Sequence, residues 1–90
     1  MVQYHFIVYG HVQGVFFRVS TKREADRLGV VGWVKNKQDG SVEVLCQGTQ
    51  KEITMFFNYC KHGPEEALVS RVEILETSFQ NAYEGFKIVG

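Results

Sequence analysis

Cysteine is scarce in this sequence, and the two that occur stand apart from any recognisable motif. Cys46 and Cys60 each lie inside an apolar segment, and no CxxC motif or Cys/His cluster accompanies them. Neither a zinc site nor a disulfide framework is indicated. Unpaired thiols of this kind are typical of a reducing compartment, so we expect a cytoplasmic protein without a metal.

Long hydrophobic runs are absent as well. Nowhere do 18 apolar residues follow one another, and the first ten residues lack the basic start and apolar stretch of a secretory signal. We therefore expect a soluble, unprocessed chain that does not associate with a membrane.

The chain also lacks a net charge that could attract a charged partner from a distance. Ten Lys and Arg residues balance ten Asp and Glu residues, and the sequence pI is about 6.8. This balance argues against binding to nucleic acid or to an anionic membrane surface. Any recognition of charge must therefore be local.

What the chain does contain is a regular alternation of strand and helix patterns. Its 90 residues suffice for one domain with one core. β-branched and aromatic residues alternate over 2–9, which predicts a strand. Small or apolar residues then recur at spacings of four, four and three over 17–28, which predicts a helix. Gly29 stands where a left-handed C-cap would end that helix.

A hairpin is expected next. Residues 30–37 and 41–47 are both rich in β-forming residues, and they flank the dipeptide Asp39-Gly40. An Asp-Gly pair between two such runs is a strong signal for a tight turn. We predict two antiparallel neighbouring strands.

The remaining residues predict one helix and two strands. Thr49 and Glu52 have the spacing of a capping box, and apolar residues then keep helical periodicity until Gly63-Pro64 stops the helix. Alternation over 68–74 predicts a fourth strand. Residues 86–88 indicate a short final strand after a polar loop.

This order of elements is βαββαβ with a short C-terminal strand, and no repeat, linker or low-complexity segment interrupts it. Two strand–helix–strand units with right-handed crossovers can interleave into one sheet. We therefore predict a single α+β domain over residues 1–90. Its fold would be a ferredoxin-like sandwich, an antiparallel sheet with two helices on one face.

The stretch GHVQGVFFR, from Gly10 to Arg18, must turn the first strand abruptly into the first helix. Gly10 and Gly14 can take backbone angles that are closed to other residues. The amides of the loop and of the first helical turn could then converge on one anion, and the Arg18 guanidinium could hold two phosphate oxygens. Because a cation at a helix N-terminus opposes the macrodipole, Arg18 is poorly placed unless an anion offsets it. The alternative is a merely tight corner with Arg18 extended into solvent.

Other catalytic groups are missing from this stretch. It has no serine, cysteine or aspartate to act as a phosphorylated nucleophile, and no carboxylate pair or histidine cluster marks a metal. His11 is more simply a solvated turn residue than an acid or base.

Asn36 stands near the end of a strand, where asparagine is disfavoured. Its amide could hold a water molecule, or it could simply help to end the strand.

Two separated motifs resemble those of one known family. GHVQGVFFR resembles the signature of the acylphosphatase family, and GWVKNKQDGSVEVLCQG resembles the family's second signature, in the right order. FFNYCKHGPEEALVSRVE further resembles the family's second helix and fourth strand. The similarity thus extends over nearly the whole chain.

The resemblance implies a ferredoxin-like enzyme that hydrolyses the carboxyl–phosphate bond of acyl phosphates to a carboxylate and inorganic phosphate. No metal or cofactor is implied. By position, the phosphate-binding arginine of the family falls on Arg18 and its water-orienting asparagine on Asn36. The phosphate cradle falls on the backbone of Gln13, Gly14, Val15, Phe16 and Phe17.

The sequence departs from the family pattern in places. His11 stands where an arginine or lysine is frequent, which affects substrate steering, and the C-terminal FKIVG lacks a basic or aromatic ending. The side chains of Phe16 and Phe17 are better explained as core or rim residues than as a stacking platform.

Two other functions are compatible with parts of the pattern. A non-catalytic anion-binding or regulatory module could use the same loop without turnover. An RNA-binding domain of similar fold is disfavoured, because SVEVLCQG lacks the aromatic and basic residues that such a domain displays. We expect the chain to act as a monomer.

Overall fold

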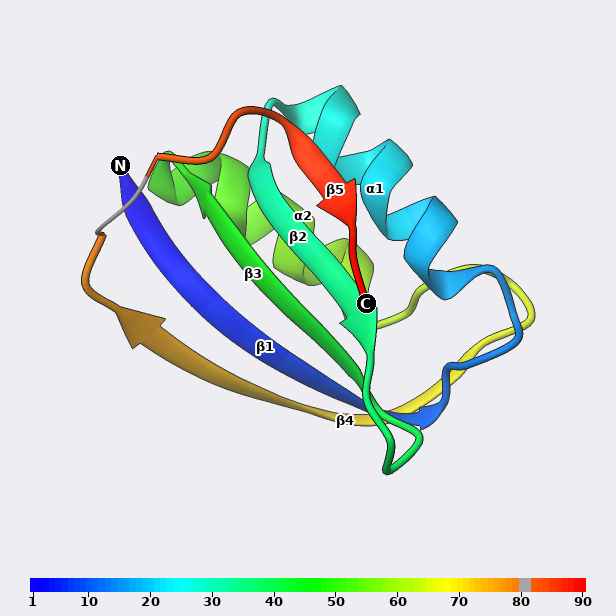
Figure 1. Cartoon of the computed structure of the whole chain (residues 1–90). Coiled ribbons are helices and arrows are strands. Elements are labelled where there is room, and N and C mark those ends of the chain that lie inside the picture. The colour runs from blue at the N-terminus through cyan, green and yellow to red at the C-terminus, as the bar shows by residue number, and fades with distance from the viewer. Residues whose placement is uncertain (80–81) are drawn as a thin grey trace.

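The computed structural model of the chain describes residues 1–79 and 82–90 (Figure 1). Residues 80 and 81 belong to the polar loop expected before the last strand, and they lie outside the described residues. The elements follow in the order β1 (Val2–His11), α1 (Phe17–Leu28), β2 (Val31–Asn36), β3 (Val42–Gly48), α2 (Gln50–Cys60), β4 (Leu68–Thr77) and β5 (Phe86–Ile88). Every strand and helix expected from the sequence is present in that order.

The strands form one five-stranded sheet in the order β4-β1-β3-β2-β5, and both helices cover the same face of it (Figure 1). The four long strands pair antiparallel, as predicted. The short β5 instead runs parallel to β2, which makes the sheet mixed. β4 and β5 are the two edge strands of the sheet. The last residue of β4 lies at the end of the sheet where β2 begins, so β5 starts at that same end and runs in the direction of β2.

The core fills the space between the sheet and the two helices. Alternate residues of the strands point into it, and phenylalanine rings link its parts. The Phe56 ring lies 6.2 Å from that of Phe6 and 5.6 Å from that of Phe86. Cys46 and Cys60 are both buried and unpaired, as expected of small core residues.

The predicted start of α2 and the predicted end of α1 are also confirmed, whereas α2 ends at Cys60, before the expected stop at Gly63-Pro64. At the start of α2, the Thr49 hydroxyl accepts a 3.1 Å hydrogen bond from the amide of Glu52, whose carboxylate accepts a 2.9 Å bond from the amide of Thr49. Gly29 ends α1 in the left-handed conformation, with φ 80°. Neither helix of the described chain has the length and apolar character needed to cross a membrane.

Candidate active site

The corner between β1 and α1 has three residues in backbone conformations with positive φ. Gly10 has φ 132°, and a Cβ there would lie 2.1 Å from the carbonyl oxygen of Leu68, so the close approach of β4 requires glycine. Gly14 has φ 75°. Both glycines thus adopt the unusual angles that the sequence predicted. The third residue, Phe16, has φ 64°, which the sequence did not predict.

The backbone amides of this corner have no acceptor among the residues that the structure describes. Among the described residues, none accepts a hydrogen bond from the N–H groups of 13–19, and no side chain caps the N-terminus of α1. The first internal bond of the helix runs from the amide of Ser20 to the carbonyl of Phe16, at 3.0 Å. The loop and the first turn therefore present several free donors, as an anion site requires.

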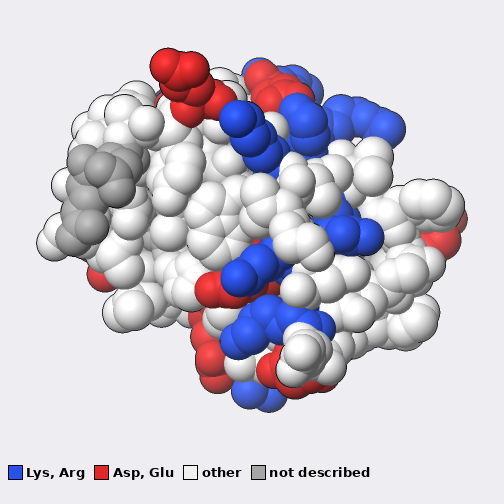
Figure 2. Space-filling view, in the orientation of Figure 1, with Lys and Arg blue, Asp and Glu red and all other residues white. Residues whose placement is uncertain are grey.

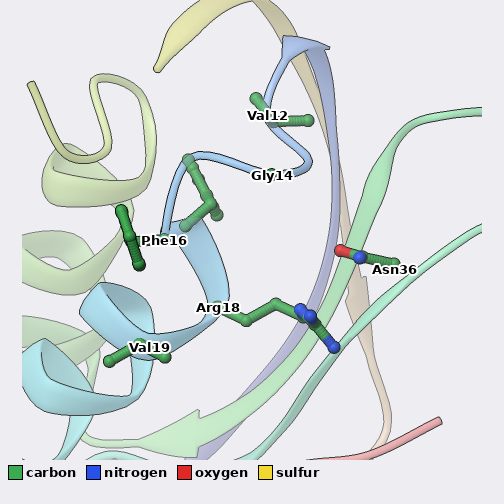
Figure 3. Close-up of a pocket in the computed structure, with 7 residues that line it drawn as sticks. Val12, Gly14, Phe16, Arg18, Val19 and Asn36 are labelled. Carbon is green, nitrogen blue, oxygen red and sulfur yellow. The ribbon is translucent and has the colours of Figure 1, made fainter. Parts of the chain in front are cut away.

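These residues surround a cavity of about 250 Å³ between α1 and the end of β2. Its lining consists of Val12, Gly14, Phe16, Phe17, Arg18, Val19 and Asn36. Figure 3 shows the Arg18 side chain extending from α1 toward Asn36 on β2. The fold therefore brings together the two residues that the sequence singled out, although they lie 18 positions apart along the chain.

Arg18 and Asn36 each have unused hydrogen-bonding capacity. In the described part of the chain, no carboxylate forms an ion pair with the Arg18 guanidinium, which is half-buried. The Oδ1 atom of Asn36 is buried, and no described donor reaches it. An unpartnered buried polar atom is costly in a finished core, so these groups are better explained by a bound ligand or water.

The other predicted cradle residues differ in what their side chains do. Val15 and Phe17 are buried in the core and anchor the two ends of the turn, so only their backbones can face a ligand. Phe17 is also among the residues that line the cavity. The Phe16 side chain is exposed. The expectation that the two phenylalanines are core or rim residues is thus confirmed, with Phe17 in the core and Phe16 at the rim.

Gln13 connects this loop to the β2–β3 hairpin. Its side-chain Nε2 donates hydrogen bonds of 2.7 Å to the carbonyl of Lys37 and 2.9 Å to that of Ser41. The amide of Lys37 donates to the same Ser41 carbonyl at 2.9 Å. Gln13 therefore binds the two residues that close the turn of the hairpin. The sequence indicated the Gln13 backbone only. No local signal could reveal a contact made 24 and 28 residues away.

The turn beyond Asn36 is held by Asp39. Its Oδ1 accepts hydrogen bonds from the Ser41 hydroxyl at 2.5 Å and from the Ser41 amide at 2.9 Å. These bonds favour the charged carboxylate and hold the pKa of Asp39 below its ordinary value. The predicted Asp-Gly turn is therefore confirmed. The Asp39 side chain stabilises the turn that follows the strand end carrying Asn36.

Ordinary acid–base groups lie away from the cavity. His11 is exposed and does not line it, and His5 pairs with Glu43 at 2.5 Å on the sheet face opposite the helices. Burial raises the pKa of Cys46 to about 12 and also raises that of Cys60. Among the described residues, no three metal-ligating side chains form a cluster that could hold a metal ion. Figure 2 shows Lys and Arg side chains across one face of the molecule, with Asp and Glu side chains beside several of them.

Comparison with known proteins places this geometry in a family. The acylphosphatase family model matches residues 4–88. An acylphosphatase of Thiobacillus denitrificans is 48% identical over 83 residues, covering 92% of this chain and 91% of the relative. One of Thermococcus kodakarensis is 44% identical over 89 residues, covering 99% and 97%. The crystal structure of acylphosphatase from Bacillus subtilis superposes with a TM-score of 0.97 at 38% identity, with all of both chains covered. The chain therefore belongs to the acylphosphatase family.

Proposed function

We propose that the loop from Gln13 to Arg18 holds the phosphoryl group of an acyl phosphate while Asn36 holds the water that attacks it. Hydrolysis of acyl phosphates is the activity that membership of the acylphosphatase family gives this chain. The observation that carries the assignment is the meeting of free amides, an unpaired guanidinium and an unpartnered amide oxygen around one cavity.

The phosphoryl group would be bound by backbone and guanidinium donors. The free amides of 13–18 donate to its oxygens, and Arg18 adds a planar pair of N–H groups that matches two of them. Negative charge is spread over these oxygens in the transition state, and donors already in position stabilise it without reorganisation. Phosphate binding also removes the unfavourable interaction between Arg18 and the helix dipole.

Asn36 would orient the nucleophile. One O–H of a water molecule donates to the buried Oδ1 atom, which leaves an oxygen lone pair directed at phosphorus. The water oxygen forms a bond to phosphorus while the bond from phosphorus to the acyl oxygen breaks. The departing carboxylate takes the electron pair of that bond, and inorganic phosphate remains in the cradle.

This reaction needs little acid–base help from the protein. A carboxylate is a good leaving group, so no side chain has to protonate it. In the described structure, no carboxylate, imidazole or thiol lines the cavity. We therefore assign the proton of the attacking water to a phosphoryl oxygen of the substrate itself.

We further propose that the chain acts as a cytoplasmic monomer. Arg18 and Asn36 line one cavity of a single chain, so one chain supplies both side chains that the proposal uses. Two unpaired buried thiols are compatible with a reducing compartment. Light scattering at the concentration of the activity assay should give the mass of one chain, 10.3 kDa, and a multiple of it would contradict the proposal.

Benzoyl phosphate hydrolysis by the purified chain tests the site. We expect Arg18→Lys and Asn36→Ala each to lower kcat/KM by about 10²–10³-fold, the usual loss when one transition-state donor is removed. Arg23→Lys and Asn58→Ala make the same chemical changes at exposed helical positions and should leave the rate unchanged.

Two results would contradict the assignment. Wild-type activity no better than that of either site variant would reject the roles of Arg18 and Asn36. Binding of inorganic phosphate at the loop, measured by calorimetry, without turnover of benzoyl or acetyl phosphate would instead support a non-catalytic anion-binding module.

A further inference from the structure

Phe16 is a large apolar side chain in an unexpected position. It is 72% exposed, although it stands between Val15 and Phe17, which are both buried. A single exposed aromatic residue needs no special explanation on a protein surface. This one, however, lines the mouth of the phosphate cavity, so its exposure places apolar surface where a substrate must pass.

The backbone of Phe16 makes its presence more unusual. With φ 64° and ψ 22°, it is the one non-glycine residue of the described chain that has a positive φ. Bulky residues are rare in this conformation, which glycine or asparagine adopts more easily. The fold alone would thus favour Gly or Asn here. Strain kept at a binding site is a reason to look for a role of the side chain.

A second exposed apolar side chain lies beside it. Val19 lies in the first turn of α1, which begins directly after Phe16, and it is 49% exposed. Both residues line the cavity. Figure 3 shows Phe16 and Val19 on the α1 side of the cavity and Asn36 on the opposite side.

This arrangement determines where the acyl group must lie. In an in-line displacement, the leaving group departs on the side of phosphorus opposite the attacking water. If Asn36 holds the water, the carboxylate leaves toward α1, where Phe16 and Val19 are exposed. The α1 side of the cavity thus combines the exposed apolar side chains of Phe16 and Val19 with the Arg18 guanidinium, which extends toward Asn36.

We propose that Phe16, supported by Val19, forms an apolar seat for the acyl group, so that this site selects acyl phosphates with aromatic or other large apolar acyl groups. The inference rests on the proposed function, because it uses the positions assigned to the phosphoryl group and to the water. It assigns to Phe16 a role in specificity that is separate from the role of its backbone in the cradle.

The test compares benzoyl phosphate with acetyl phosphate in the wild type and in Phe16→Gly. Glycine accepts the left-handed backbone, so this variant should fold with a melting temperature no lower than that of the wild type. We expect the ratio of kcat/KM for benzoyl to acetyl phosphate to fall about three- to tenfold, the loss expected for one aromatic contact. Comparing this ratio between the variant and the wild type cancels the difference in intrinsic reactivity between the two substrates.

Three further variants sharpen the result. Asparagine also tolerates the left-handed backbone but is less flexible than glycine. Phe16→Asn should therefore lower the ratio as Phe16→Gly does, which shows that loop flexibility is not the cause. Phe16→Trp keeps an aromatic surface and should retain the preference for benzoyl phosphate. Leu75→Ser removes a side chain that is similarly exposed on β4 and should leave the ratio unchanged.

The outcomes separate this inference from the proposed function. If Phe16→Gly and Phe16→Asn lower kcat/KM for benzoyl and acetyl phosphate by the same factor, the site is an acylphosphatase site but Phe16 does not contact the acyl group. If the wild type hydrolyses neither substrate, the proposed function itself is wrong, and this inference is rejected with it.

Discussion

The side-chain amide of Gln13 donates a 2.7 Å hydrogen bond to the carbonyl oxygen of Lys37, the residue that follows Asn36 in the chain. A second bond of 2.9 Å to the carbonyl of Ser41 secures the same nitrogen. The loop that presents the free amides is thereby attached to the strand end that presents the Asn36 amide. One side chain thus links the two halves of the proposed site.

Replacement of Gln13 by Glu should lower kcat without weakening the binding of inorganic phosphate. Glutamate has nearly the same shape, but it turns an acceptor toward the two carbonyl oxygens and breaks both bonds. The loop and Asn36 then lose their relative alignment, for which a loss of about 10–100-fold in kcat is reasonable. The inhibition constant of inorganic phosphate should change little, because Arg18 and the amides remain.

Two comparisons distinguish alignment from general damage. Gln38→Glu makes the same change at an exposed position of the same hairpin and should have no effect on kcat. In a double-mutant cycle, Gln13→Glu should cost much less in an Asn36→Ala background than in the wild type. Additive losses in that cycle would show that Gln13 acts elsewhere.

Gly14 and Gly40 provide a matched pair of left-handed glycines. They have φ 75° and 92°, and a Cβ added to either would meet no atom within 4 Å. Alanine at either position should therefore lower the free energy of unfolding by a similar amount, about 1–2 kcal/mol, through backbone strain alone. Only Gly14 lines the cavity. We expect Gly14→Ala, but not Gly40→Ala, to lower kcat/KM about tenfold or more.

Urea unfolding and benzoyl phosphate kinetics on both variants check this prediction. The expected pattern is equal destabilisation and unequal activity. Equal activity in the two variants would mean that the loop backbone at Gly14 does not face the substrate.

The buried thiols should make the fold weaker at alkaline pH. Burial raises the pKa of Cys46 from 9.0 to about 12, so the folded state keeps a proton that the unfolded state loses. The free energy of unfolding therefore falls between pH 9 and about 12, by about 1.4 kcal/mol per pH unit for one such thiol. Cys60 is shifted in the same direction by burial.

Unfolding of the wild type and Cys46→Ala at several pH values isolates this effect, because all other titrating groups are common to both. The stability difference between the two proteins should shrink by about 2 kcal/mol from pH 9 to pH 11. A difference that stays constant over this range would show that the Cys46 thiol is accessible or already ionised. Cys46 should also react slowly with a thiol reagent at pH 8 until the protein is unfolded.

Much of the fold was predictable because its signals are local. The capping box at Thr49, the C-cap at Gly29 and the Asp-Gly turn at 39–40 each depend on residues within a few positions of one another. The same holds for the alternating strands and the helical periodicity. The parallel pairing of β5 was not predictable, because it depends on which edge of the sheet is still open when the chain returns.

The candidate site divides in a similar way. Arg18 and the glycines of its loop could be identified from one stretch of sequence, since the turn and the helix N-terminus are local structures. The weight given to Asn36 came from the family resemblance, because its strand-end position alone has a simpler explanation. The Gln13 contact and the exposure of Phe16 could not be read from the chain at all.

By itself, the sequence determined the order of the elements, the glycine-rich corner and the family, because backbone propensities and short motifs act over a few neighbouring residues. Only the tertiary structure decided that Arg18 faces Asn36 across one cavity, that the loop amides remain free, and that Gln13 binds the hairpin. The physical reason is that these relations arise from packing α1 against the sheet. That packing brings together groups whose separation along the chain carries no information about their separation in space.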